Sequence, residues 1–220
     1  TLFRSGFIEI GTVTPKPQRG NPRPRLFRLK RDKAILNRMG FNSEGVEAMI
    51  AQVKRRTSTV ILGINIGKNA ATPLESAVDD YVFCYDRVYA HADYVVANIS
   101  SPNTENLRLL QFDEHLKKLL SALKQRQAHH TKISGIYKPL VIKVSPDLTS
   151  EEIKTLSQSF IDYAIDGVIA TNTTVARDSL STRDFDNEKG GVSGKPLYLK
   201  STDVLRQFHA HLQAHMPLIG

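Results

Sequence analysis

The chain has 220 residues, 40% of them hydrophobic, which is enough for one folded domain with a substantial core. It carries 30 lysine and arginine residues against 22 acidic residues, a net charge of +8, which indicates an anionic membrane surface or an anionic ligand as a partner. The basic residues lack the interleaved aromatic residues of a nucleic-acid binder, and the single cysteine, Cys84, excludes an internal disulfide and is typical of a small buried residue.

Apolar runs alternate with segments of helical periodicity along the whole chain. Strands are predicted at residues 7–11, 60–65, 94–99, 139–144, 167–170 and 217–220. Helices are predicted from about residue 43, from a capping box at 72–75, around 116–123, from a second capping box at 149–152, and around 204–212. The stretch between the first strand and the first helix contains four prolines and is predicted to be a loop. This alternation predicts a parallel sheet in a single α/β domain spanning residues 1–220.

Two parallel architectures fit this alternation, an open doubly wound sheet and the (β/α)8 TIM barrel. No Gly-x-Gly-x-x-Gly turn follows the first strand, which argues against a dinucleotide-binding sheet. Polar residues stand at or just after the carboxyl ends of five strands: Thr12, Asn65, Asn98 with Ser101, Lys143, and the run 171–173. Because all strand ends of one polarity meet on one rim of a barrel, the sequence favours the barrel with a site on that rim.

The segment 98–104 begins where the apolar run 94–97 stops abruptly in small polar residues. Pro102 restricts the backbone around Ser101, which would hold its hydroxyl beside the amides of Asn98 and Asn103. The same composition is typical of an ordinary strand-ending turn, and that alternative stays open on these residues alone. The site as a whole is poor in carboxylates and rich in amides, which suits a ligand with both donors and acceptors, such as a pyrimidine-like ring.

Lys143 stands between two apolar residues of a predicted buried strand, so it needs an anionic or strongly polar partner. A structural salt bridge and charge stabilisation beside an electron-rich cofactor or an oxyanion are the two interpretations. The seven histidines lie in helical or loop segments, where we expect solvated surface and no metal site.

Six motifs in a fixed order resemble dihydroorotate dehydrogenase: GTVTP at 11–15, NRMGFN at 37–42, GINIGKN at 63–69, NISSPNT at 98–104, ATNTT at 170–174 and GGVSGKPL at 190–197. Serine at position 101, where the soluble class carries cysteine, resembles the membrane-associated, quinone-reducing class 2 enzymes. The resemblance implies oxidation of (S)-dihydroorotate to orotate in pyrimidine biosynthesis, with FMN as the hydride acceptor and a quinone as the final oxidant. It replaces the interpretation of the Ser101 segment as a simple turn.

The resemblance also assigns roles by position. Ser101 would be the catalytic base that removes the C5 proton, aided by a water molecule or Thr104 because free serine is a weak base. The implied substrate-binding residues are Asn37, Arg38, Met39, Gly40, Phe41, Asn98, Asn103, Asn172 and Thr173. The implied FMN-binding residues are Thr12, Asn65, Asn98, Lys143, Thr171 and Gly194.

Compared with the family, the chain is expected to be an incomplete barrel containing about strands 2 to 7. We expect it to lack the first strand, the C-terminal end and the N-terminal helices that meet the quinone and the membrane. The resemblance implies a peripheral protein on the cytoplasmic face of a bacterial inner membrane, or alternatively of the mitochondrial inner membrane. Two other hypotheses remain, a related FMN barrel that uses fumarate or NAD as the acceptor, and a non-catalytic fragment.

Overall fold

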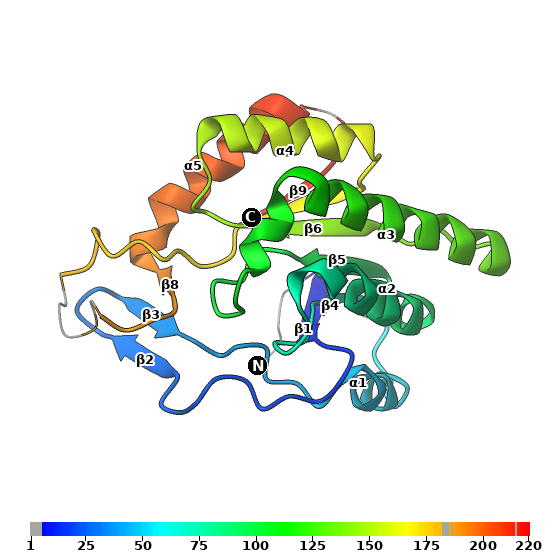
Figure 1. The fold of residues 1–220 in the computed structure, drawn as a ribbon, viewed down its shortest axis with the longest axis horizontal. Helices are drawn as coiled ribbons and strands as arrows, with labels where there is room; N and C mark the ends of the chain where they lie inside the picture. The colour runs from blue at the N-terminus through cyan, green and yellow to red at the C-terminus, as the bar shows by residue number, and fades with distance from the viewer. Residues whose placement is uncertain (1–5, 182–184, 186, 214) are drawn as a thin grey trace.

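The main sheet of the computed structural model, which describes residues 6–181, 185, 187–213 and 215–220, has six parallel strands. In spatial order they are β1 (Phe7–Val13), β4 (Ile61–Ile66), β5 (Tyr94–Asn98), β6 (Leu140–Val144), β7 (Gly167–Ala170) and β9 (Leu218–Ile219). Each strand pairs with the next parallel strand along the chain, and the sheet curls as part of a (β/α)8 barrel does (Figure 1). The predicted α/β fold with an incomplete TIM barrel is confirmed.

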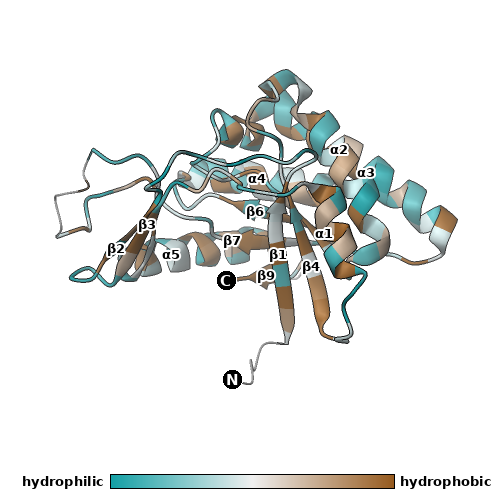
Figure 2. Cartoon of the chain, turned by 90° about the horizontal axis from the view of Figure 1, so that it is seen from below, coloured by the Kyte–Doolittle hydropathy of each residue, from teal (hydrophilic) through white to brown (hydrophobic). Residues whose placement is uncertain are grey.

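Helices lie between the strands and cover the convex side of the sheet. They are α1 (Val46–Val53), α2 (Ala77–Val88), α3 (Asp113–Ser134), α4 (Ser150–Asp162) and α5 (Lys195–Leu212), with 3₁₀ turns at Leu74–Ser76, Tyr89–His91 and Leu107–Gln111. Their apolar sides form one large core with the strands, while their outer surfaces are hydrophilic (Figure 2). None of the described helices is long and apolar enough to cross a membrane.

The sequence of β5 is a continuous apolar run up to Asn98 and does not alternate between apolar and polar residues. The packing of its side chains explains this. Val95 and Ala97 pack into the core beneath the helices, whereas Tyr94 and Val96 join a separate apolar cluster on the concave face. Both faces of the strand are therefore buried, as is typical of a parallel sheet. The next residue on the concave face is Asn98, so the two-residue period of the strand delivers its amide to the rim.

The structure contains a second, antiparallel sheet, formed by segments that were not predicted as strands. It consists of β2 (Leu26–Leu29), β3 (Ala34–Asn37) and β8 (Gly191–Gly194) and lies beside the barrel-like sheet (Figure 1). The strict alternation of strand and helix predicted from the sequence was therefore wrong for these segments. Each strand has only four residues, and β3 pairs with a strand more than 150 residues away, so local periodicity carries little signal for either.

The two predicted capping boxes have different outcomes. At the start of α4, Thr149 Oγ1 accepts from the Glu152 amide at 3.3 Å and Glu152 Oε2 accepts from the Thr149 amide at 2.7 Å, which confirms that box. The box at residues 72–75 was wrong, since Pro73 caps a 3₁₀ turn with no side-chain bond and α2 begins only at Ala77. Pro73 has no N–H, and the turn it opens takes the place of a capped first helical turn.

Two single-residue predictions concern the helices. Cys84 is fully buried in α2, and burial raises the pKa of its thiol far above the ordinary value, which confirms an inert core residue. His130 differs from the expected solvated histidine, because its ring stacks on Tyr89 with centroids 4.8 Å apart and its Nε2 lies 2.8 Å from Asp86 Oδ1. Among the described residues, no group of three or more His, Cys, Asp or Glu side chains is placed to hold a metal ion.

Candidate active site

The site lies at the carboxyl ends of the parallel strands, where the sequence predicted a polar rim. A chain of hydrogen bonds joins these strand ends. Thr12 Oγ1 donates to Asn65 Oδ1 at 2.6 Å, Asn98 Nδ2 donates to Thr12 Oγ1 at 2.9 Å, and Asn172 Nδ2 donates to Asn98 Oδ1 at 3.2 Å. The three asparagines and the threonine come from β1, β4, β5 and the loop after β7, so the sheet curvature brings together residues up to 160 positions apart.

Glu9 lies at one end of this row of hydrogen bonds, and it was not identified from the sequence. Its Oε1 accepts from Asn65 Nδ2 at 2.8 Å, which fixes the orientation of the Asn65 amide. Glu9 lies on the concave side of β1, three residues before Thr12 at the rim, and its alternation with Ile8 and Ile10 could have shown that it faces inward.

The Ser101 loop is held by polar contacts on both sides. Ser101 is buried, and its Oγ accepts from the Asn103 amide at 3.2 Å. Asn103 Nδ2 donates to Asn37 Oδ1 at 3.1 Å, and Asn21 Nδ2 donates to the Asn103 carbonyl at 3.2 Å. The structure therefore brings Ser101, Asn103 and Asn37 together, although Asn37 belongs to the antiparallel sheet.

Thr104, three residues after Ser101 in the same loop, is also buried. Its Oγ1 makes no hydrogen bond with any group that the structure describes. Buried polar atoms normally have partners, and an unpaired hydroxyl in a site loop is free to bond a water molecule or a ligand.

Lys143 stands on the concave face directly opposite Asn98 in the β5–β6 pairing. Its side chain forms neither a hydrogen bond nor an ion pair with any described residue, and it is only partly exposed. The salt-bridge interpretation finds no partner in the described part of the chain. An unpaired ammonium group beside a row of amides is suited to an anionic or electron-rich ligand.

Below the rim, Tyr94 closes the concave face. The position of Gly63 is needed for this, because a side chain there would collide with the Tyr94 ring. Burial, together with the nearby Glu9 carboxylate, raises the pKa of Tyr94 to about 12. The Tyr94 phenol, which lies on the concave face near the Glu9 carboxylate, therefore stays neutral at neutral pH.

The remaining predicted residues are less closely joined. Thr171 Oγ1 donates to the Asn172 carbonyl at 2.9 Å, and the Thr173 amide donates to Asn172 Oδ1 at 2.8 Å, so this loop is ordered by its own side chains. Gly194 lies in the antiparallel sheet opposite Ala34, and no described hydrogen bond links it to the other predicted cofactor residues.

Residues 38–41, predicted to form a wall of the substrate pocket, make different kinds of contact. The Arg38 guanidinium donates to the Pro24 carbonyl and lies 3.3 Å from Glu188, so its charge is engaged on the antiparallel sheet. The Met39 and Gly40 carbonyls accept from the Asn21 amide and from Gln18, while the Phe41 ring packs against the main core. All these contacts hold the wall in place beside the rim.

Glycine at position 191 joins the two sheets at the site. A side chain there would collide with Thr173 and would approach Pro102 of the Ser101 loop to 3.1 Å. Strand β8 therefore packs directly on two loops of the rim, which only a residue without Cβ permits.

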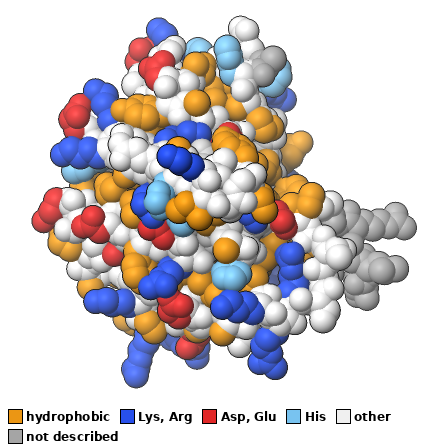
Figure 3. All heavy atoms as spheres, turned by 90° about the vertical axis from the view of Figure 1, so that its right-hand side faces the viewer, with side chains coloured by type: hydrophobic (Ala, Val, Ile, Leu, Met, Phe, Trp, Pro, Cys, Tyr) orange, Lys and Arg blue, Asp and Glu red, His pale blue; other side chains and the backbone are white. Residues whose placement is uncertain are grey.

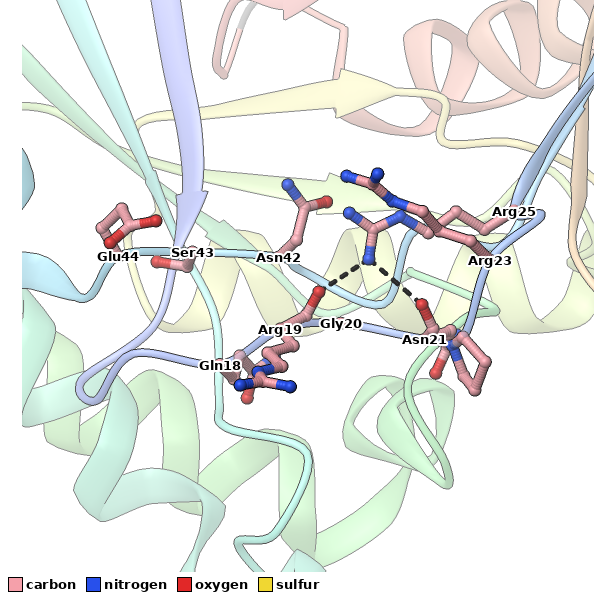
Figure 4. A pocket seen from close by; sticks show the side chains of 10 residues that line it. Gln18, Arg19, Gly20, Asn21, Arg23, Arg25, Asn42, Ser43 and Glu44 are labelled. Atoms are coloured by element: carbon pink, nitrogen blue, oxygen red, sulfur yellow. Dashed lines mark hydrogen bonds between the residues drawn. The ribbon is translucent and has the colours of Figure 1, made fainter.

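An adjoining cavity of about 650 Å³ is lined by residues 18–23, 25 and 42–44. Figure 4 shows its polar lining, in which the Arg25 guanidinium donates to the carbonyls of Arg19 at 2.6 Å and Asn21 at 3.1 Å. Asn21 also contacts Asn103, so this basic cavity lies next to the candidate site.

Two further polar residues behind the rim, Arg108 and Asp147, were also missed. Arg108 bonds the carbonyls of Ser100 and Thr173, and Asp147 receives four hydrogen bonds, from Arg108, Thr174, Val175 and Lys200. Burial opposes ionisation of Asp147, but the bonds from Lys200, Thr174, Val175 and Arg108 outweigh it and lower the pKa of this carboxyl. Asp147 follows the end of β6, a position that could have marked it, whereas nothing around Arg108 in the sequence marks its role.

These features define a class of protein: an α/β barrel-type fold with a buried, amide-rich site on the carboxyl rim of its parallel strands. Residues 2–220 match the family model of dihydroorotate dehydrogenase. The chain belongs to the dihydroorotate dehydrogenase family.

Similar proteins support this assignment. The chain is 54% identical over 215 residues to a protein of Acinetobacter baumannii and 54% identical to one of Chromobacterium violaceum, both named dihydroorotate dehydrogenase (quinone). It covers 98% of its own length in both alignments but 64% and 62% of these relatives. A crystal structure of the Eimeria tenella enzyme in complex with ferulenol superposes with a TM-score of 0.88 at 36% identity, covering 96% of this chain and 62% of that one.

Proposed function

We propose that the protein containing this chain oxidises (S)-dihydroorotate to orotate with a bound FMN and passes the electrons to a quinone. The observation that carries this proposal is the continuous hydrogen-bonded row Asn65–Thr12–Asn98–Asn172 beside Ser101, in a chain of the dihydroorotate dehydrogenase family. A pyrimidine ring offers alternating donors and acceptors, and amide side chains match both kinds of group.

Substrate binding is assigned to the amides on both sides of the Ser101 loop. Asn98 and Asn172 approach from the parallel sheet, while Asn37 and Asn103 approach from the antiparallel sheet and the loop. We assign the wall of the pocket to residues 38–41 and Thr173, as the family resemblance implies. The substrate would then lie between the two sheets, with the buried Tyr94 ring beneath it.

Proton removal is assigned to Ser101. Its buried hydroxyl lies in a loop that Pro102 and Asn103 restrain, so it can face one carbon atom of the substrate. A serine needs help to accept a proton at neutral pH, and the unpaired Thr104 hydroxyl, alone or through a water molecule, is the group available in the loop.

The residues present fit a flavin. Lys143 lies on the concave face with no partner among the described residues, and Thr12, Asn65, Asn98, Thr171 and Gly194 provide hydroxyl, amide and backbone groups for the ring and its chain. When bound, FMN supplies a two-electron acceptor for the hydride that leaves the substrate. The contribution of Lys143 is a fixed positive charge that stabilises negative charge near the ring.

A membrane-facing role fits the charge distribution. Residues 19–38 contain eight basic residues and one acidic residue, a net charge of +7 out of +8 for the whole chain. We therefore propose that the antiparallel sheet faces an anionic membrane surface, where a quinone would be met, in a peripheral protein of a bacterial inner membrane or the mitochondrial inner membrane.

The test is the visible absorption spectrum of the purified full-length protein, followed by addition of dihydroorotate without oxygen. Yellow flavin bands that bleach would support both cofactor and substrate. Reoxidation of the bleached protein by a quinone, and not by fumarate or NAD, would identify the acceptor. A colourless protein, or a flavin that dihydroorotate does not reduce, would contradict the proposal and favour a non-catalytic role.

A further inference from the structure

Each of the three nitrogen atoms of the Arg108 guanidinium group donates a hydrogen bond to a different residue. Nε donates to the Ser100 carbonyl at 3.1 Å, Nη2 donates to the Thr173 carbonyl at 3.0 Å, and Nη1 donates to Asp147 Oδ2 at 2.9 Å. The side chain is 22% exposed and that of Asp147 is 14% exposed, so these charge-assisted bonds are largely shielded from solvent.

The three partners come from three neighbouring strands. Ser100 follows β5, Asp147 follows β6 and Thr173 follows β7, and β6 lies between the other two in the sheet. Beyond the strand ends, the Ser100 and Thr173 loops therefore share no strand pairing of their own. On the side of the site, Asn172 Nδ2 links the two loops by donating to Ser100 Oγ at 3.1 Å and Asn98 Oδ1 at 3.2 Å. From behind, the planar Arg108 group bridges their backbones.

Asp147 fixes the orientation of that group. Its Oδ1 accepts from Lys200 Nζ and Thr174 Oγ1, each at 2.5 Å, and its Oδ2 accepts from the Val175 amide at 2.8 Å in addition to Arg108. All acceptor positions of this carboxylate are used, so it cannot turn without losing several bonds. Asp147 therefore fixes the Arg108 guanidinium, whose other two nitrogen atoms bond the backbone carbonyls of Ser100 and Thr173.

We infer that Arg108 is a positioning residue for the reaction, which sets the distance between Ser101 and the substrate-binding residues Asn172 and Thr173. The inference rests on the proposed function. The residues whose carbonyls Arg108 holds are the neighbour of the proposed base and a proposed substrate contact itself. A displacement of about 1 Å between reacting groups can lower a rate by about 10²-fold.

The distinguishing variant is Arg108→Lys. A lysine keeps the positive charge near Asp147, but its single ammonium group cannot reproduce the three-way planar geometry. Arg126→Lys is the matched control, because Arg126 pairs with Asp86 at 2.7 Å with a similar exposure of 32%, on α3 far along the chain from the rim loops. Arg108→Ala, with and without added guanidinium ion, tests whether the missing group alone is responsible.

The following measurements on the full-length, flavin-loaded protein decide the outcome. We expect Arg108→Lys to slow anaerobic flavin bleaching by dihydroorotate by 10- to about 100-fold and to weaken orotate binding, with flavin content and melting temperature close to those of the wild type. Hydrogen exchange should increase at residues 98–104 and 171–175, and guanidinium ion should restore part of the Arg108→Ala rate.

An Arg108→Lys protein within threefold of the wild type in bleaching and orotate binding would overturn the inference. So would a loss of rate that only follows loss of flavin or of folded protein, since that is a structural role. A wild-type protein that dihydroorotate does not bleach contradicts the proposed function instead, and hydrogen exchange of the two loops still reports on Arg108 in that case.

Discussion

The carboxyl rim of the parallel sheet and the antiparallel sheet β2–β3–β8 enclose the candidate site from two sides, but their chemistry differs. The rim is buried and consists mainly of amides and hydroxyls joined in one row. Strands β2 and β3 of the antiparallel sheet lie in the stretch 19–38, which carries nearly all of the net charge, and the other 200 residues together sum to only +1. Figure 3 shows one of those other faces, where basic and acidic side chains are mixed.

The difference indicates a division of roles. Neutral donors and acceptors can orient a ring without the desolvation cost of buried charges, so they suit the buried rim. Basic side chains at the surface remain hydrated and act at a distance on anionic partners. Changes in the rim should therefore affect chemistry, and changes in the antiparallel sheet should affect association.

The largest effect is expected at Ser101. Ser101→Ala should slow flavin reduction by dihydroorotate by roughly 10²- to 10⁴-fold, because the proton acceptor is lost, while flavin stays bound. Stopped-flow absorbance under anaerobic conditions measures the rate, and Ser159→Ala on the outer surface of α4 is the control. Unchanged reduction in Ser101→Ala would remove the assignment of the base.

Lys143→Ala tests the charge at the rim. Removal of an unpaired ammonium group should weaken flavin binding or slow its reduction by about tenfold or more, a loss of roughly 1.4 kcal/mol per factor of ten. Flavin release on dilution and the anaerobic reduction rate are the two measurements. Wild-type behaviour in both would leave Lys143 with a purely structural role.

Asp147→Asn tests the hydrogen bonds of Asp147 behind the rim through the pH dependence of the free energy of unfolding. The pKa of Asp147 is lower in the folded state than in the unfolded chain, so the unfolded chain binds more protons. The contribution of Asp147 to stability is therefore present above about pH 4, the ordinary pKa of an aspartate, and is lost as the pH falls through the pKa of the folded state. We expect the variant to lose roughly 2 kcal/mol in urea unfolding at pH 7. The difference from wild type should shrink below pH 4, and a difference independent of pH would contradict the assignment.

The smallest effect is expected in the turn between β2 and β3 of the antiparallel sheet. Lys30→Gln or Arg31→Gln should each weaken binding to vesicles containing anionic phospholipid by about 1 kcal/mol, or about fivefold, without changing flavin reduction. Co-sedimentation at low and high salt measures this, with Lys154→Gln on α4 as the control. Equal loss in the control would mean that net charge matters and not this surface.

The sequence by itself determined the parallel α/β architecture and much of the rim. Strands buried on both faces have continuous apolar runs, and a two-residue period decides which residue reaches the rim, so Asn65 and Asn98 could be placed from local pattern alone. Thr12 could be placed only at a strand end, because the register of β1 shifts between Ile10 and Val13. The capping box at Thr149 was equally local, since its two bonds join residues three positions apart.

Tertiary structure decided the features that depend on distant residues. Strands β2, β3 and β8 form only because each finds a partner, and β3 pairs with β8 across more than 150 residues. Whether Lys143 had a partner could not be read from its neighbours, and nothing in the segment around Arg108 showed that its guanidinium joins three loops. Hydrogen bonds between loops depend on how the strands are ordered in space, and periodicity along the chain contains no information on that order.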